Sequence, residues 1–139
     1  MRWYAAFFLV GSLVSCASSE DSKSSSSGTT VKPNASFKND VMPIIADSCA
    51  LQACHSSKDS NLGIYLTSDP TQVFAELKKS SASGNKKFVA PGDSKASWVM
   101  IKMDGLQGSV GKEMPPDTRL AKVDRDVVRS WIDQGAKDN

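Results

Sequence analysis

The sequence predicts a small all-α domain of three to four short helices with long loops, preceded by a disordered tether. Two observations support this fold class. Several short segments carry apolar residues three and four positions apart, which is the spacing of one helix face, and no stretch of useful length alternates as a half-buried strand does. Residues 17–35 are dominated by serine and other polar residues, so we expect them to form a flexible chain without a core.

Composition limits the range of functions. The chain has 139 residues, of which 40% are hydrophobic and 23% charged, and its formal net charge is +2. A chain of this length forms one domain, which is too small for an enzyme with a cleft between two domains. Nucleic-acid binding normally needs a dense basic face, which this near-neutral balance does not provide. We therefore expect no nucleic-acid partner.

Residues 1–15 have the features of a lipoprotein signal peptide. One positive charge, Arg2, precedes an apolar run at residues 3–10, which is shorter than the roughly 20 residues that span a bilayer. The sequence Leu-Val-Ser-Cys follows at residues 13–16 and resembles the lipobox of bacterial lipoproteins. This resemblance implies that Cys16 becomes the lipidated first residue. The alternative is an ordinary secretory signal with an incidental cysteine.

Residues 16–35 are predicted to be a Ser-rich flexible tether, and residues 36–139 the folded domain. About 19 residues of such a coil have a typical reach of about 24 Å, which would hold the domain clear of the lipid surface. In lipoproteins, an aspartate after the lipidated cysteine marks retention in the inner membrane, and Ala17 stands there instead. The resemblance therefore implies a lipid anchor in the bacterial cell envelope, at the outer membrane and facing the periplasm.

Four helices are expected in the domain. Their predicted positions are residues 36–47, 70–79, 98–103 and 124–135. Ser36 is a suitable N-cap for the first helix, and Pro43 lacks a backbone donor, so this helix should start late or bend there. The third helix should stop at Gly105, and the last should end at Gly135 in a C-cap position. The last helix is the most clearly defined, because its apolar residues fall on one stripe.

Two cysteines and the only histidine of the chain lie within seven consecutive residues. With Cys16 assigned to the lipid, Cys49 and Cys54 remain as a pair in an oxidising compartment, and His55 follows directly. Covalent attachment of haem c needs two thiols for two vinyl groups and a histidine immediately after the second thiol. The usual spacing has two residues between the cysteines, and here there are four. The extra pair can loop out without moving Cys54 and His55.

Two other chemistries fit the same residues. A disulfide between Cys49 and Cys54 would close a small loop and stabilise the fold by roughly 2 kcal/mol, giving a haem-free binding or structural module. A metal site is the third possibility. Two cysteines and one histidine give three ligands, for which methionine would be an unusual fourth on zinc, whereas copper could use all three residue types. We expect no enzyme, because the only histidine is already committed to this cluster.

A sixth ligand of haem iron would have to be methionine, since the chain has no second histidine and a His/Met pair is a common arrangement. The candidates are Met42, Met100, Met103 and Met114. Met42 lies beside Pro43 in the first helix, and Met100 and Met103 fit an apolar helix face. Met114 differs because prolines follow it and glycines precede it, so a loop with a fixed backbone could present its sulfur.

Five segments resemble, in order, the small class I-like bacterial cytochrome c domains of the planctomycete and Bacteroidetes type. These segments are residues 41–45, 49–55, 91–97, 114–116 and 131–136. The resemblance implies one covalent haem c per chain on Cys49 and Cys54, with His55 as the proximal and Met114 as the distal iron ligand. It also implies that the N-terminal helix crosses the C-terminal helix near Trp131. The implied function is a lipid-anchored monohaem cytochrome that carries single electrons between redox partner proteins of the envelope.

Overall fold

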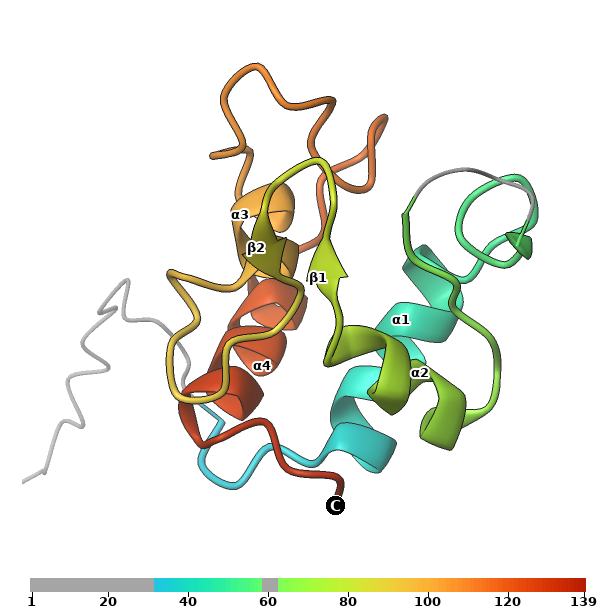
Figure 1. Cartoon of the computed structure of the whole chain (residues 1–139). Coiled ribbons are helices and arrows are strands. Elements are labelled where there is room, and N and C mark those ends of the chain that lie inside the picture. The colour runs from blue at the N-terminus through green and yellow to red at the C-terminus, as the bar shows by residue number, and fades with distance from the viewer. Residues whose placement is uncertain (1–31, 59–62) are drawn as a thin grey trace, which may run out of the picture.

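The computed structural model describes residues 32–58 and 63–139 (Figure 1). The predicted signal peptide, the Cys16 lipidation site and the first part of the tether lie outside these residues. The described part is mostly helical, which confirms a small helical domain, and it adds a two-stranded sheet that the sequence does not predict. Among the residues that the structure describes, no helix is both long and apolar enough to cross a membrane.

The first predicted helix is built from two pieces. Ser36 caps it as expected, because its hydroxyl accepts a hydrogen bond from the backbone N–H of Asn39 at 3.3 Å. A π-helical turn, η1 (Phe37–Val41), then leads into α1 (Met42–Ser48), which has Pro43 in its first turn. Pro43 has no N–H to donate, and the backbone changes from π-helical to α-helical hydrogen bonding next to it. Helical structure thus begins at Phe37, and the predicted late start holds only for its α-helical part.

The last four residues of the predicted tether contact the domain. The carbonyl of Lys32 accepts hydrogen bonds from the Ser130 hydroxyl at 2.7 Å and from the side-chain amide of Gln134 at 3.0 Å. The Lys32 ammonium is paired with Asp40, and Ala35 is buried. The folded part of the chain therefore begins a few residues earlier than the sequence predicts.

The other three helices lie close to their predicted positions. They are α2 (Pro70–Leu77), α3 (Trp98–Met103) and α4 (Lys122–Asp133). The carboxylate of Asp69 caps α2 by accepting a hydrogen bond from the N–H of Thr71 at 2.9 Å. After α4, Gly135 has a φ of 100°, a left-handed conformation that glycine adopts without strain. This confirms the predicted end of the last helix.

A short hairpin lies between α2 and α3. It pairs β1 (Ser80–Ser81) with β2 (Lys86–Lys87) in antiparallel orientation. Strands of two residues are too short to show an alternating pattern, which is why the sequence does not reveal them. In the turn, a Cβ atom added to Gly84 would lie 2.6 Å from the indole of Trp98. The hairpin therefore packs directly on the first residue of α3.

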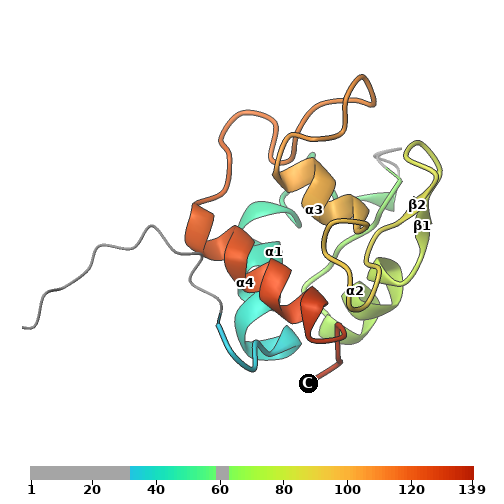
Figure 2. The ribbon, with the colours of Figure 1, turned by 90° about the vertical axis from the view of Figure 1, so that its left-hand side faces the viewer.

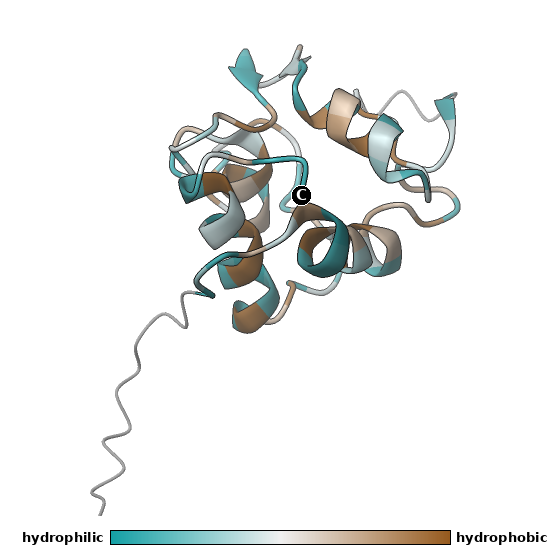
Figure 3. Cartoon of the chain, turned by 90° about the horizontal axis from the view of Figure 1, so that it is seen from below, coloured by the Kyte–Doolittle hydropathy of each residue, from teal (hydrophilic) through white to brown (hydrophobic). Residues whose placement is uncertain are grey.

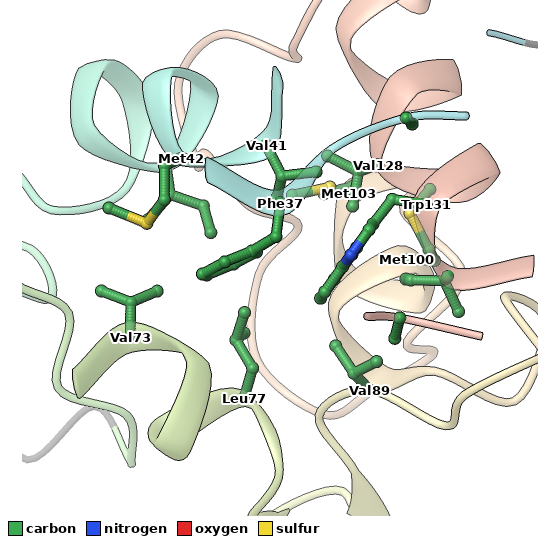
Figure 4. Close-up of a cluster of buried hydrophobic side chains, with 14 of the residues drawn as sticks. Phe37, Val41, Met42, Val73, Leu77, Val89, Met100, Met103, Val128 and Trp131 are labelled. Atoms are coloured by element: carbon green, nitrogen blue, oxygen red, sulfur yellow. The ribbon is translucent and has the colours of Figure 1, made fainter. Parts of the chain in front are cut away.

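The core joins all of the helices. In Figure 1, α1 and α2 lie on one side of the domain and α3 and α4 on the other, and each helix shows both brown and teal residues in Figure 3. Figure 2 shows α4 running across the first helical segment. Phe37 lies 5.2 Å from Trp131 and 5.2 Å from Phe74 between ring centroids. Other buried side chains pack around Phe37 and Trp131 (Figure 4). The N-terminal helix thus meets the C-terminal helix at Trp131.

The turn at residues 91–97 fixes α3 relative to α4. The N–H of Gly92 donates to the carbonyl of Ile132 at 2.8 Å, and the N–H of Ser94 donates to the carboxylate of Asp133 at 2.9 Å. The fully buried hydroxyl of Ser97 accepts a hydrogen bond from the N–H of Ala90 at 2.9 Å. The start of α3 is therefore bonded to the end of α4, which sets the position of one wall of the cavity described below.

Candidate functional site

A cavity of about 960 Å³, counted out to its open mouth, lies between α1, α3, α4, the hairpin and the segment around Leu66. Most of its walls are apolar, with Ile45, Leu77 and Trp98 among the lining residues. Ligand pockets in proteins commonly combine apolar walls with a few polar groups. The lining of the cavity therefore suits a mostly apolar ligand.

Three of the four predicted cofactor-binding residues line this cavity. Cys49 comes from the end of α1, His55 from the loop after it, and Met114 from the loop between α3 and α4. Cys54 is not among the lining residues; it is half-buried and lies near enough to Cys49 to influence its thiol. The two thiols are not bonded to each other. Residues that are far apart in the sequence are thus brought to one cavity.

The four residues between the cysteines form a compact loop. The N–H of Cys54 donates to the carbonyl of Leu51 at 3.0 Å, and the hydroxyl of Ser56 donates to the same carbonyl at 2.9 Å. The N–H of His55 donates to the carbonyl of Cys49 at 3.3 Å, which joins the two ends of the loop. Within the loop, Ala53 has a left-handed φ of 66°. The chain folds back on itself here, as the looping out of an extra pair requires.

His55 is half-buried and is oriented by the backbone of the segment that follows. Its Nδ1 lies 3.2 Å from the carbonyl oxygen of Ile64, and its own carbonyl accepts a hydrogen bond from the N–H of Leu66 at 2.8 Å. A carbonyl can only accept, so Nδ1 carries the proton and, in the neutral ring, Nε2 keeps its lone pair. Metal-binding histidines are commonly oriented in this way by a hydrogen bond from the other ring nitrogen.

The protonation states of His55 and Cys49 follow from their burial. Burial lowers the pKa of His55 below its ordinary value; the hydrogen bond to Ile64 acts in the opposite direction, and the charge of Lys102 lowers the pKa further. The imidazole is therefore neutral near pH 7 and can act as a ligand. Burial and, to a smaller extent, the neighbouring Cys54 raise the pKa of Cys49 to about 11, so its thiol stays protonated at this pH.

The methionines separate into two groups. Met114 is half-buried and lines the cavity, and its N–H donates to the carbonyl of Lys102 at 3.0 Å. Met103, which the sequence assigns to a packed helix face, is buried but also lines the cavity. Met42 and Met100 are buried in the core and are not among the lining residues. Two methionines, rather than one, therefore have side chains that reach this cavity.

Two groups at the site are not found by reading the sequence. The first is the Ile64 carbonyl, which depends on the chain returning past His55 after the loop. The second is Lys102 on α3, which also lines the cavity. Its ammonium donates to the carbonyl of Val110 at 3.0 Å and to that of Lys112. No local sequence pattern predicts either contact, because both depend on how distant loops pack.

The described ranges, residues 32–58 and 63–139, hold no group of three or more His, Cys, Asp or Glu side chains placed to bind a metal ion. Cys49, Cys54 and His55, the three possible ligands of the alternative metal site, are therefore not brought together as such a group. Comparison of the chain with protein-family models, with curated proteins and with solved structures finds no match. The geometry of the cavity is what bears on function.

Proposed function

We propose that the chain is a lipid-anchored monohaem c-type cytochrome with a small class I-like cytochrome c domain, which carries single electrons between redox partner proteins of the bacterial cell envelope. One haem c would be bound through Cys49 and Cys54, with His55 and Met114 as iron ligands. One observation carries the proposal: Cys49, His55 and Met114 line the same largely apolar cavity, and Cys54 stands beside them.

The donor set fits a haem iron. His55 has its Nδ1 proton engaged by the Ile64 carbonyl, so Nε2 is the nitrogen left for a metal. Met114 offers a thioether from a different loop that lines the same cavity. Iron held by one histidine and one methionine is a common arrangement in cytochromes c, and thioether ligation raises the reduction potential. Neither ligand needs to lose a proton near pH 7, because the imidazole is neutral and the thioether has no proton.

Cys49 and Cys54 offer two free thiols for attachment. Each would add across one vinyl group, with the sulfur bonding to one carbon and the thiol hydrogen going to the other, so no electron is gained or lost. The haem-free alternative joins the same two cysteines in a disulfide, whereas in the structure the two thiols are not bonded to each other.

The walls of the cavity set the environment of the cofactor. When bound, the haem supplies an iron that changes between the ferric and ferrous states and so takes up or releases one electron. Apolar side chains such as Ile45, Leu77 and Val128 would exclude water from its faces. A dry site disfavours the more highly charged form of the iron, which again raises the reduction potential. This environment supports electron transfer.

Haem loading tests the proposal directly. The full chain is expressed in the periplasm together with a haem-attachment system, and then examined by haem staining after denaturing electrophoresis, by mass and by absorbance. We expect the added mass of one haem, a stain that survives denaturation and a Soret band. The Cys49→Ser, Cys54→Ser double variant should lose the stain. A protein two hydrogens lighter than its reduced form and without a Soret band would instead identify the disulfide module and contradict the proposal.

The anchor is tested separately with Cys16→Ser. Bacterial lipoproteins carry several acyl chains, which together give stable membrane attachment where one chain is marginal. We expect the variant to leave the membrane fraction after a salt wash while retaining covalent haem, since Cys16 lies outside the haem-binding segment. Retention of the variant in washed membranes would show that the anchor is a different segment.

A further inference from the structure

The loop between α3 and Met114 has little of its own to hold it in place. Gly105, Gly108 and Gly111 all have left-handed φ angles, of 71°, 61° and 67°. Leu106 is 72% exposed, so an apolar side chain of the loop points away from the core. A segment with three such glycines and little apolar burial gains little from packing and loses much conformational entropy when ordered. Its position must therefore be set by specific bonds.

Most of the bonds that return this loop to α3 go to one residue, Lys102. The Lys102 ammonium donates to the carbonyl of Val110 at 3.0 Å and to the carbonyl of Lys112, and the Lys102 carbonyl accepts from the N–H of Met114 at 3.0 Å. Three successive points near the end of the loop are thus fixed by the two polar ends of a single residue. The last of these points is the predicted distal ligand.

The Lys102 side chain is itself held in one position. Its ammonium lies 5.6 Å from the ring centroid of Trp98, one turn earlier on α3, within the range of a cation–π contact. Trp98 is buried, and Gly84 of the hairpin packs directly against its indole. The loop is close on the other side as well, since a Cβ atom added to Gly111 would lie 3.2 Å from the Lys102 nitrogen. The Lys102 side chain is therefore in contact with α3 and with the loop, and Trp98 links it to the hairpin.

We propose that Lys102 is the positioning residue for Met114: its ammonium and its carbonyl clamp residues 110–114 so that the Met114 side chain stays in the cavity that His55 also lines. This inference rests on the proposed function, because it names how the distal ligand of that site is kept in place. Lys102 is not itself an iron ligand in this arrangement. It acts through the loop, and its removal should release the methionine without removing the haem.

The first test measures how easily Met114 is displaced from oxidised, haem-loaded protein. Imidazole is titrated against the far-red sulfur-to-iron charge-transfer band, which reports Met114 ligation. Lys102→Leu removes the ammonium, keeps an apolar side chain that favours helix and adds no sulfur to the cavity. We expect it to bind imidazole about tenfold more tightly, because hydrogen bonds from a charged donor no longer hold the loop. The control Lys112→Leu removes a charge from the same loop but keeps the accepting carbonyl, and should stay within about twofold of the wild type.

A second pair of variants tests the clamp from the loop side. Gly111→Ala and Gly108→Ala place the same methyl group at similar left-handed φ angles, but only the one at residue 111 meets the Lys102 nitrogen, whereas nothing lies within 4 Å at residue 108. The difference between the two variants therefore isolates contact with Lys102 from backbone strain. We expect Gly111→Ala to bind imidazole several-fold more tightly than Gly108→Ala. Equal affinities in both variant pairs would overturn the proposal.

Hydrogen exchange separates this inference from the proposed function. In the full chain without haem, the Met114 amide hydrogen should be protected by its bond to the Lys102 carbonyl. Lys102→Leu should speed its exchange about tenfold, while the amides of α4 keep their protection. If haem does not load, the proposed function fails, and this measurement still decides whether the clamp exists. Unchanged exchange at Met114 in Lys102→Leu would overturn it.

Discussion

The two sides of the cavity are held by different kinds of interaction. On the His55 side, most of the hydrogen bonds involve backbone groups. The N–H of His55 donates to the Cys49 carbonyl, and the Ile64 carbonyl and the Leu66 N–H bond to the histidine from the segment that follows. On the Met114 side, the loop is rich in glycine and is joined to α3 largely through one lysine side chain.

This difference has a consequence for the order in which the ligands are lost. Backbone hydrogen bonds survive most side-chain substitutions, because every residue carries the same donor and acceptor. A bond made by one ammonium disappears with one substitution. We therefore expect the histidine side to stay in place under mild perturbation and the methionine side to open first. The predictions below test this contrast, beginning with the largest expected effect.

Replacing His55 should have the largest effect, because it removes the proposed proximal ligand. His55→Leu keeps an apolar side chain of intermediate size but has no nitrogen for iron. We expect the low-spin haem spectrum to be lost, because no second histidine exists in the chain to replace it. Absorbance of the purified variant gives the measurement. A wild-type Soret position and low-spin visible bands in this variant would show that another residue is the proximal ligand.

Replacing Met114 should remove only the proposed distal ligand. In Met114→Leu, covalent haem should remain, while the far-red charge-transfer band disappears and the reduction potential falls, since thioether ligation favours the ferrous state. Met103→Leu is the matched control, because Met103 also lines the cavity and the exchange conserves volume. The control should keep the band. The opposite pattern, with the band lost only in Met103→Leu, would assign the ligand to α3 instead of the loop.

Asp104 lies at the start of the loop that leads to Met114 and fixes this end of the loop to α4. Its carboxylate accepts hydrogen bonds from Arg125 at 2.6 Å and from Arg129 at 2.7 Å. Burial acts to raise the pKa of Asp104, but the hydrogen bonds and charges of Arg129 and Arg125 outweigh it, so the pKa lies below the ordinary 3.8. A carboxylate of this kind stabilises the fold above its unfolded pKa, and the stabilisation is lost as pH falls through the lower, folded pKa.

Asp104→Asn should therefore reduce the free energy of unfolding by about 1–2 kcal/mol at pH 7. The difference from the wild type should shrink as the pH falls below 3.8, the ordinary pKa of an aspartate. Denaturant unfolding at several pH values measures both effects. Asp117→Asn, which removes the same charge from an exposed position, should change stability by no more than a few tenths of a kcal/mol. A difference that stays constant down to pH 2 would show that charge is not responsible.

The helices could be predicted from the sequence because their signals are local. Ser36 as a cap, Pro43 as an interruption and Gly135 as an end each act through their own backbone geometry, and the structure places them as expected. The hairpin could not be predicted, since two residues per strand leave no pattern. The packing of Lys32 and Ala35 on the domain was also hidden, because nothing in a Ser-rich segment marks where contact with a distant helix begins.

The sequence predicts candidate donors but not the groups that orient them. Residue type and neighbours single out Cys49, Cys54, His55 and Met114, and the structure brings all of these except Cys54 to the lining of one cavity. The Ile64 carbonyl and the Lys102 ammonium are supports that depend on where the chain returns in space, and any residue can supply a carbonyl. Met103 is a second example of what the sequence does not reveal. Helical periodicity indicates that Met103 is buried, but it does not indicate that a cavity lies on that side of α3.

The loop between Cys49 and His55 has a consequence for how such a site can vary. Because its ends are joined by the bond between the His55 N–H and the Cys49 carbonyl at 3.3 Å, the gap that the chain crosses is shorter than the number of residues suggests. Leu51, at its turn, is 45% exposed. A segment that leaves and returns to the same place can gain or lose residues at its tip while its two ends stay where they are. If both cysteines bind one haem, as proposed, their number of intervening residues could change while their separation in space is kept.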